Sequence, residues 1–521
     1  MAVAETTQRE SRVKKTLLNA RVNLIFYFLT LCLSFFSRKI FLDCLGADFV
    51  GLTGTLQNLL GFLNLAELGI GSAIGYVLYK PLFDRDQTKI NEIISVMGYL
   101  YRWIGLIILG SGIILSCFLP LIFPDRDTGF HLPLIYFAYY AFLGSSLIGY
   151  FINYRQNLLG ADQRNYVVTA YFQTMNIVKT IIQMALAYYT GNFYLWVAIE
   201  FAFGIIYSFI LNWKINQTYP WLKTEISQGK ALFKKYPEVI KYTKQLFVHK
   251  ISSFVQFQTT PFLIYAFVNL QIVAFYGNYT LIVDKFSGLF SNVISSTGAS
   301  VGNLIAEGNT KKAIYVFWEL FSIQIFITAF CAFELFLLIN PFITLWLGAD
   351  YMLPTATILL ILTRYFIMSS RTTVDQFIYG YGLFYDTWAP IAESAIFLSG
   401  AICAGYFFGL NGVLFGGILS LMVIVWGWKP IFLYAKGFKT TIVTYWLNLL
   451  KYYIVTAAGM VLTYMLLGKA LYIDPSKNVL NWCVYGLVSS FCFIAIYGSL
   501  LYIFIPGARR LASRMIHKNR V

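Results

Sequence analysis

The chain has 521 residues, of which 58% are hydrophobic and 12% are charged, and its mean hydropathy is +0.67. Soluble domains carry about 25% charged residues, so this composition excludes a water-soluble protein of this size. The formal net charge is +16. The basic residues occupy alternate hydrophilic gaps and form no continuous stripe, which excludes a nucleic-acid-binding protein and indicates the orientation of a membrane protein.

The beginning of the chain is hydrophilic and basic over residues 1–21, and no small-residue cleavage site follows the first apolar run. We therefore expect an uncleaved first span that acts as its own insertion signal. The seven cysteines and three histidines are scattered, without a C-x-x-C pair. This spacing predicts neither a disulfide framework nor a metal site.

The apolar runs predict about fourteen membrane-spanning helices, because one span needs about 20 apolar residues. An even number of spans places both ends of the chain on the same side of the membrane. The predicted spans are 22–42, 52–79, 93–121, 132–153, 166–189, 192–213, 251–269, 271–305, 313–340, 355–379, 389–408, 411–434, 449–468 and 480–505.

The distribution of lysine and arginine orients these spans. Of the 39 Lys and Arg residues, 29 lie on the side that holds the two termini, four lie on the other side and six lie inside predicted spans. Because cytoplasmic loops are enriched in Lys and Arg, both termini are expected in the cytoplasm.

The largest hydrophilic gap, 214–250, divides the spans into six and eight and carries eight lysines. We interpret it as a basic cytoplasmic linker that lies along anionic lipid headgroups, in preference to a protein-binding module. The predicted organisation is an N-terminal lobe (1–213, spans 1–6), the linker (214–250), a C-terminal lobe (251–434, spans 7–12), and spans 13–14 with a basic cytoplasmic tail (435–521).

The two lobes show a weak internal repeat at an offset of 223 residues. In each copy a short outer loop precedes a long span and a basic cytoplasmic exit, as in transporters built from repeated halves. We therefore expect an all-α polytopic membrane protein in which two pseudo-repeated six-helix lobes enclose a central cavity, followed by two C-terminal helices. The matched residues are Val50 with Val273, Gly54 with Gly277, Ser72 with Ser295, Gly75 with Gly298, and Lys89 with Lys312.

Ionisable residues inside spans are costly in hydrocarbon, so each should face a partner or a wet cavity. Lys179 and Glu200 lie at similar depth on two spans joined by a short outer turn, which predicts a structural ion pair. Arg38 and Glu334 lie near the outer ends of their spans, where either snorkelling or a cavity position is open.

The remaining intramembrane charges fall near the middle of separate spans. Two readings stay open: a chain of internal salt bridges, or the hydrated, net-cationic cavity that we prefer. Arg364 and Arg371 share one helix face because they are seven residues apart, and Asp375 follows Arg371 by four. The predicted cations are Arg102, Lys285, Arg364 and Arg371, the predicted cavity carboxylates are Glu67, Asp284 and Asp375, and polar neighbours are Asn64, Asn278 and Asn292.

Residues 43–92 carry three short motifs in one hairpin. These are LG-x-x-x-x-G at Leu45, ELG-x-G at Glu67, and YKPL-x-x-x-D from Tyr79 to Asp86. With the span count, the central linker and the repeated halves, this hairpin resembles the opening of bacterial polysaccharide flippases. These are the O-antigen and capsule repeat-unit transporters of the multidrug/oligosaccharidyl-lipid/polysaccharide exporter superfamily.

The resemblance implies a flippase in the bacterial cytoplasmic (inner) membrane that carries an undecaprenyl-pyrophosphate-linked oligosaccharide outward by alternating access. Arg can bind a pyrophosphate bidentately, so the four predicted cations would cradle it. The carboxylates would separate these cations before cargo arrives or accept a coupling ion, H⁺ or Na⁺. We expect no cofactor, no enzymatic activity and a monomer, with membrane lipids and polysaccharide-assembly proteins as partners.

Two alternatives remain open at this point. A MATE-like drug or cation antiporter would use the three carboxylates to bind a cationic cargo, although the four cations weigh against it. A membrane glycan polymerase or glycosyltransferase would need a sizeable outer loop, and the predicted outer loops are short.

Overall fold

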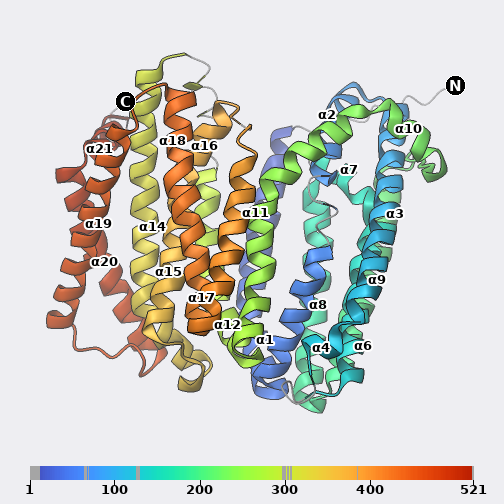
Figure 1. Cartoon of the computed structure of the whole chain (residues 1–521), viewed down its shortest axis with the longest axis horizontal. Coiled ribbons are helices and arrows are strands. Elements are labelled where there is room, and N and C mark those ends of the chain that lie inside the picture. Colours follow the sequence, from blue (N-terminus) through green and yellow to red (C-terminus); the bar gives the residue numbers. More distant parts are fainter. Residues whose placement is uncertain are drawn as a thin grey trace. The chain divides into compact units, whose positions relative to one another are not determined.

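A computed structural model describes residues 12–518, except 64–66, 68–69, 125–129, 163, 296–300, 302–303, 306–307 and 384 (Figure 1). Within these residues the protein is helical, with short 3-10 and π segments and no β-strand. Eight helices are long and apolar enough to cross a membrane. The protein is an all-α polytopic membrane protein, as its composition predicted.

The chain forms two compact units, Met1–Phe262 (unit 1) and Leu263–Val521 (unit 2). The helix α11 (Pro237–Phe267) contains the boundary between them. The other helices of unit 1 are α1 (Arg12–Leu63), α2 (Ile70–Asp84), α3 (Gln87–Ser116), α4 (Leu119–Ile122), α6 (Leu132–Phe151), η2 (Asn153–Arg155), α7 (Gln156–Ala161), α8 (Asn165–Thr190), α9 (Phe193–Thr218), η3 (Ile226–Gln228) and α10 (Gly229–Lys235).

Unit 2 is a second helical bundle, in which α19 and α20 pack against each other and α20 also packs on α14 (Figure 1). Its apolar core is strongly aromatic, with fully buried Phe317, Phe321, Phe377 and Phe493. Its helices are α12 (Leu270–Ser295), α14 (Thr310–Trp346), η4 (Ala349–Tyr351), α15 (Thr355–Ser370), α16 (Thr372–Gly380), α17 (Trp388–Leu421), η5 (Met422–Trp428), α18 (Lys429–Phe432), η6 (Leu433–Phe438), α19 (Val443–Ala470), α20 (Val479–Phe504) and α21 (Pro506–Lys518).

Each of the fourteen predicted spans overlaps at least one helix of the described chain. The spans 52–79 and 271–305 also include residues outside the described ranges, and 355–379 is divided between α15 and α16. Two pairs of spans lie in continuous helical runs that are interrupted at one glycine. Gly46 in α1 has φ 84° and Gly409 in α17 has φ 55°, a left-handed backbone that glycine adopts at little cost. Both breaks fall in the predicted gaps between neighbouring spans.

The two halves of α17 pack against each other in close backbone contact. A Cβ atom on Gly412 would lie 2.0 Å from the Ala404 carbonyl oxygen, and one on Gly416 would lie 2.2 Å from the Ala401 nitrogen. Small residues permit such approach between helices in lipid, where van der Waals packing drives association. The predicted spans 389–408 and 411–434 therefore form a tight helical hairpin.

The predicted linker is not a separate element of the described structure. Its first residues complete α9, its last residues begin α11, and the segment between them packs on the end of α3. Lys235 Nζ lies 2.7 Å from a Glu92 carboxylate oxygen, and the Glu225 backbone N–H donates to Ser95 (2.9 Å). A Cβ on Gly229 would lie 2.3 Å from that of Tyr99. The segment is thus attached to unit 1 by specific contacts in addition to any headgroup contact.

The motif YKPL-x-x-x-D has a structural role at the junction of α2 and α3. Asp86 is the N-cap of α3 and accepts a hydrogen bond from the backbone N–H of Lys89 (3.0 Å), and the Lys89 ammonium lies 3.1 Å from the same carboxylate. The backbone hydrogen bond and the ammonium group lower the pKa of Asp86 below its usual value. N-cap carboxylates stabilise a helix by satisfying its first N–H groups.

Candidate functional site

Among the described residues of unit 2, a charged network joins Arg371, Asp375 and Lys429. Arg371 Nε lies 2.7 Å from Asp375 Oδ2, and Lys429 Nζ lies 2.8 Å from Asp375 Oδ1. All three side chains are only 15–17% exposed. Glu393, which is buried, also interacts electrostatically with Arg371. We call Arg371, Asp375 and Lys429 the unit 2 ion network.

Arg371 stands at the junction between α15 and α16. The carbonyl oxygen of Ser369 accepts a hydrogen bond from Gln324 of α14 (2.8 Å) and another from the Thr372 hydroxyl (3.0 Å). Side chains that compete for backbone acceptors in this way disturb a helical ladder. The junction therefore follows from the packing of α14 on α15, while Asp375 still donates its backbone N–H to the Arg371 carbonyl (3.0 Å).

Arg364 has a different environment from Arg371, although it lies on the same helix. Its Nη1 donates to the Tyr276 hydroxyl of α12 at 3.2 Å, and it makes no salt bridge within the described residues. A Cβ on Gly417 of α17 would come within 3.9 Å of its side chain. Arg364 is thus a half-buried guanidinium between α12, α15 and α17 with spare donor groups.

The predicted residues on α12 only partly gather around Arg364. Asp284 is exposed and interacts electrostatically with Arg364 and with Lys285, which is half-buried. Asn278 is fully buried. The side chain of Asn292 lies outside the described residues. The structure therefore brings Arg364, Lys285 and Asp284 together as one group, and Arg371 with Asp375 as another.

Lys429 was missing from the predicted site. It lies near the end of the twelfth predicted span and was counted with the lysines on the side of the termini, and the structure adds that it pairs with Asp375. The helical run continues through η5, α18 and η6 to Phe438, and this extension carries the Lys429 ammonium to Asp375. The sequence did carry a sign of this: apolar residues flank Lys429 on both sides, so its charge needs a partner.

Glu67 in unit 1 is held by two tyrosines. Tyr101 of α3 donates to Glu67 Oε1 (2.5 Å), Tyr150 of α6 donates to Oε2 (2.7 Å), and the two rings meet edge to face with centroids 5.6 Å apart. Both tyrosines are buried. The carboxylate therefore links α3 and α6 to the segment before α2. Asn64, its predicted neighbour, lies outside the described residues.

Arg102 lies on an exposed face of α3 together with large apolar side chains. Its neighbours there are Trp103, Leu106 and Ile107, each at least half exposed. An exposed apolar face is typical of a helix surface that contacts lipid. A long arginine side chain on such a face can extend its charged end towards water. Arg102 lines neither of the two cavities described below. Arg38 of α1 is half-buried.

The predicted pair of Lys179 and Glu200 is present. Lys179 Nζ of α8 lies 2.6 Å from Glu200 Oε1 of α9, with side chains 17% and 21% exposed. Gln183 donates to Glu200 Oε2 (3.0 Å) and to the Trp196 carbonyl (3.1 Å). This pair therefore links α8 to α9, as the sequence predicted.

Glu334 does not snorkel, contrary to one of the two readings left open for it. It is buried on α14, and its Oε2 accepts a hydrogen bond from Ser489 of α20 (2.7 Å). A buried acceptor needs a donor to offset its lost hydration. Glu334 therefore contributes to the packing of α20 on α14.

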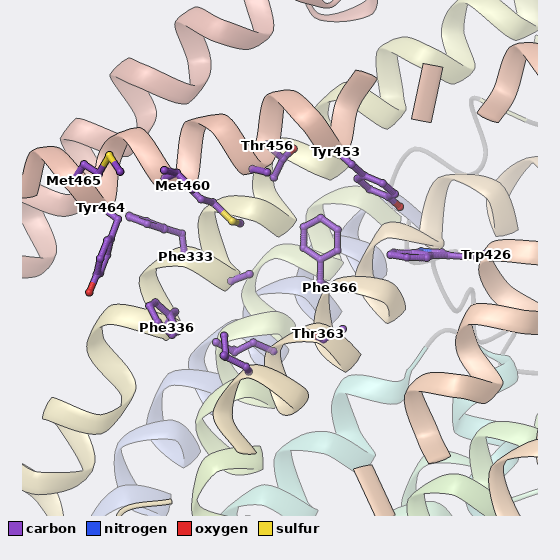
Figure 2. Close-up of a pocket in the computed structure, with 15 residues that line it drawn as sticks. Phe333, Phe336, Thr363, Phe366, Trp426, Tyr453, Thr456, Met460, Tyr464 and Met465 are labelled. Atoms are coloured by element: carbon purple, nitrogen blue, oxygen red, sulfur yellow. The ribbon is translucent and has the colours of Figure 1, made fainter. Parts of the chain in front are cut away.

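Unit 2 also contains an apolar cavity of about 500 Å³ between α14, α15, η5 and α19 (Figure 2). Aromatic and methionine side chains dominate its wall, and Trp426 and Tyr453 close one end with ring centroids 5.1 Å apart. The Thr456 hydroxyl forms a hydrogen bond with the Tyr497 hydroxyl (2.7 Å). The lining includes Phe333, Phe336, Phe366, Met460, Tyr464 and Met465.

No protein-family model and no curated protein matches the sequence. The structure is similar to that of the lipid II flippase MurJ in an inward closed conformation. That match has a TM-score of 0.62 and 15% sequence identity, and it covers 92% of this chain and 98% of the other. An inward-facing multidrug-resistance transporter of the MATE family and MOP superfamily matches with a TM-score of 0.59 and 14% identity, over 80% of this chain and 98% of its own. The chain therefore shares the helical fold of these membrane transporters.

Proposed function

We propose that the protein is a flippase that moves an undecaprenyl-pyrophosphate-linked oligosaccharide from the cytoplasmic to the outer face of a bacterial cytoplasmic membrane by alternating access. The observation that carries this proposal is Arg364, a half-buried guanidinium in the predicted span 355–379. Its described hydrogen bond goes to a neutral hydroxyl, and its interaction with Asp284 is electrostatic. Such a cation needs further anionic or water partners to offset its lost hydration. A pyrophosphate supplies the anion, and Arg binds it bidentately.

The extent of the fold likeness supports a flippase over an antiporter. MurJ matches 92% of this chain, whereas the MATE transporter, itself covered over 98% of its length, matches 80%. A fifth of this chain is therefore unmatched in that transporter.

The apolar cavity of unit 2 supports a cargo with a lipid chain. Its wall is formed by aromatic and methionine side chains of membrane-spanning helices. Flexible Met side chains and flat rings adapt to an unbranched or isoprenoid chain of varying conformation. We place part of the lipid chain there and the pyrophosphate at Arg364, with Lys285 as a second cation.

The test uses a strain that lacks the protein and makes polyprenyl-linked repeat units. Wild type is expected to prevent the accumulation of these units on the cytoplasmic face. Arg364→Ala is expected to restore accumulation, and Met460→Trp, which fills the apolar cavity, is expected to reduce export. Normal export by Arg364→Ala, at wild-type protein level, would contradict the proposal.

The MATE-like antiporter is a second candidate because the fold is shared. An antiporter for cationic drugs needs a carboxylate that is free to bind its cargo, and Asp284 is the exposed one among the predicted carboxylates of unit 2. Drug export that is lost in Asp284→Asn and kept in Arg364→Ala would favour this candidate. Orientation with both termini in the cytoplasm, coupling to H⁺ or Na⁺, and contacts with polysaccharide-assembly proteins remain part of the flippase proposal.

A further inference from the structure

Unit 1 contains a cavity of about 460 Å³ whose wall combines polar and apolar side chains. It was not predicted from the sequence. It lies between α6, α7, α8 and α9, which all belong to the same compact unit. Its volume is in the range of small-molecule sites. We call it the unit 1 polar cavity.

One wall of the unit 1 polar cavity is a polar stripe along α8. The stripe residues are three or four positions apart and therefore lie on one helix face. Neutral hydrogen-bonding side chains in a membrane-spanning helix must face partners or water. The stripe residues that line the cavity are Asn165, Thr169, Gln173, Asn176 and Lys179.

The opposite wall is built from small residues of α6 and α9. The Ser145 hydroxyl is buried and has no hydrogen-bond partner among the described residues. A Cβ on Gly149 would meet no heavy atom within 4 Å. Phe172 and Tyr207 add an aromatic side, with ring centroids 5.3 Å apart. The Ser145 hydroxyl is covered by its neighbours, so what the cavity offers at this wall is open space at Gly149 beside the ring faces.

The charge at the cavity is balanced. Lys179 and Glu200 both line it, and they neutralise each other at 2.6 Å. The other polar lining groups are amides and hydroxyls, which both donate and accept hydrogen bonds. This combination does not select a free anion or a cation. It matches a neutral ligand with many hydroxyl groups and apolar C–H faces.

We propose that the unit 1 polar cavity binds a neutral saccharide. The amides of α8 would hydrogen-bond its hydroxyls, and the aromatic side would cover its C–H faces. This inference rests on the proposed function in identifying the saccharide with part of the cargo. The binding itself does not depend on flipping.

The experiment measures sugar binding by the purified full-length protein with saturation-transfer NMR. The probes are glucose, galactose, N-acetylglucosamine and maltose, with inorganic pyrophosphate as a competitor. Gly149→Leu fills the cavity. Gly110→Leu is the matched control, because a Cβ there also meets no atom within 4 Å and Gly110 is exposed on α3.

We expect at least one sugar to receive saturation transfer from wild type and from Gly110→Leu. With Gly149→Leu that signal should fall at least tenfold. Gln173→Leu is a second variant for the case that Gly149→Leu does not fold. It leaves the small-residue wall intact and should weaken binding. Pyrophosphate should not compete. The inference would be overturned if wild type bound none of the sugars or if pyrophosphate displaced them. It would also be overturned if the folded Gly149→Leu and Gln173→Leu variants bound the sugars as well as wild type does. Sugar binding in a protein that does not flip the lipid would reject the proposed function and keep this site.

Discussion

Both units contain ion pairs between packed helices, but the two are built differently. In unit 1 Lys179 and Glu200 form a one-to-one pair, and Gln183 satisfies the second carboxylate oxygen. In unit 2 Asp375 is shared by two cations, Arg371 and Lys429. The carboxylate is the weak point of the second arrangement, because its loss leaves two positive charges without a common partner.

The comparison also separates two arginines on one stretch of helix. Arg371 is engaged by Asp375, whereas Arg364, seven residues earlier, makes one described hydrogen bond to a neutral hydroxyl. A satisfied ion pair holds helices together, and a cation with spare donors can bind a ligand. A charged residue inside a helix bundle therefore does not identify a binding site by its charge alone. Whether its hydrogen-bonding and ion-pair partners already satisfy it is the deciding property.

The largest expected effect is therefore on transport by Arg364 variants. Arg364→Ala removes a charge-assisted contact to the cargo, which is worth about 1.5–3 kcal/mol or about 10- to 100-fold in rate. Arg364→Lys keeps the charge but loses bidentate geometry, so it should recover part of the activity. Flipping of a polyprenyl-pyrophosphate-linked saccharide in proteoliposomes measures this.

The matched control for that measurement is Arg371→Ala. Because Arg371 is engaged by Asp375, its removal should lower thermal stability more than it lowers the flipping rate per folded molecule. If Arg371→Ala abolishes flipping while Arg364→Ala leaves both rate and stability unchanged, the functional contrast between the two arginines is reversed.

The second expected effect is on the stability of unit 2. Asp375→Asn leaves Arg371 and Lys429 close together without their carboxylate, and removing one partner of a buried ion pair costs about 3–5 kcal/mol. The unfolding midpoint of the purified protein should fall, and Lys429→Met in the Asp375→Asn background should restore part of it. A midpoint within error of wild type for Asp375→Asn would show that the unit 2 ion network contributes no stability.

The contrast between the units bears on what the sequence could predict. Lys179 and Glu200 were paired from depth alone, because a short turn joins their antiparallel helices and fixes which residues stand opposite. The Arg371–Asp375 pair was visible as an i, i+4 spacing. Such local relations survive any uncertainty about how distant helices pack.

Other features depended on packing that the sequence does not reveal. Arg102 has the depth of a cavity residue, but only the neighbours of α3 decide that it lies on an exposed apolar face. Lys429 was counted with the cytoplasmic lysines because a charge near the end of a predicted span usually marks the edge of the membrane. The spacing of the α8 stripe is visible in the sequence, but only the packing of α6 and α9 shows that the stripe lines a cavity.

The third prediction sharpens the reading of the unit 1 pair. The single variants Lys179→Met and Glu200→Gln and their double variant form a double-mutant cycle. We expect a coupling free energy of about 0.5–3 kcal/mol, as for residues in direct contact. Thermal unfolding midpoints of the four purified proteins measure it. Additive effects would mean that Lys179 and Glu200 are close in space but contribute to stability independently.

The smallest expected effect is that of Gln183→Leu, which removes the second partner of Glu200. Interhelical hydrogen bonds in membranes contribute about 0.6 kcal/mol each on average, and Gln183 makes two, to Glu200 and to Trp196. In wild type the loss should be small, because Lys179 still neutralises the carboxylate. In the Lys179→Met background Glu200 would lose both of its described partners, so the same substitution should lower the unfolding midpoint further. An equal shift in both backgrounds would mean that Gln183 acts through Trp196 alone, and that the ion pair needs no support from its amide neighbour.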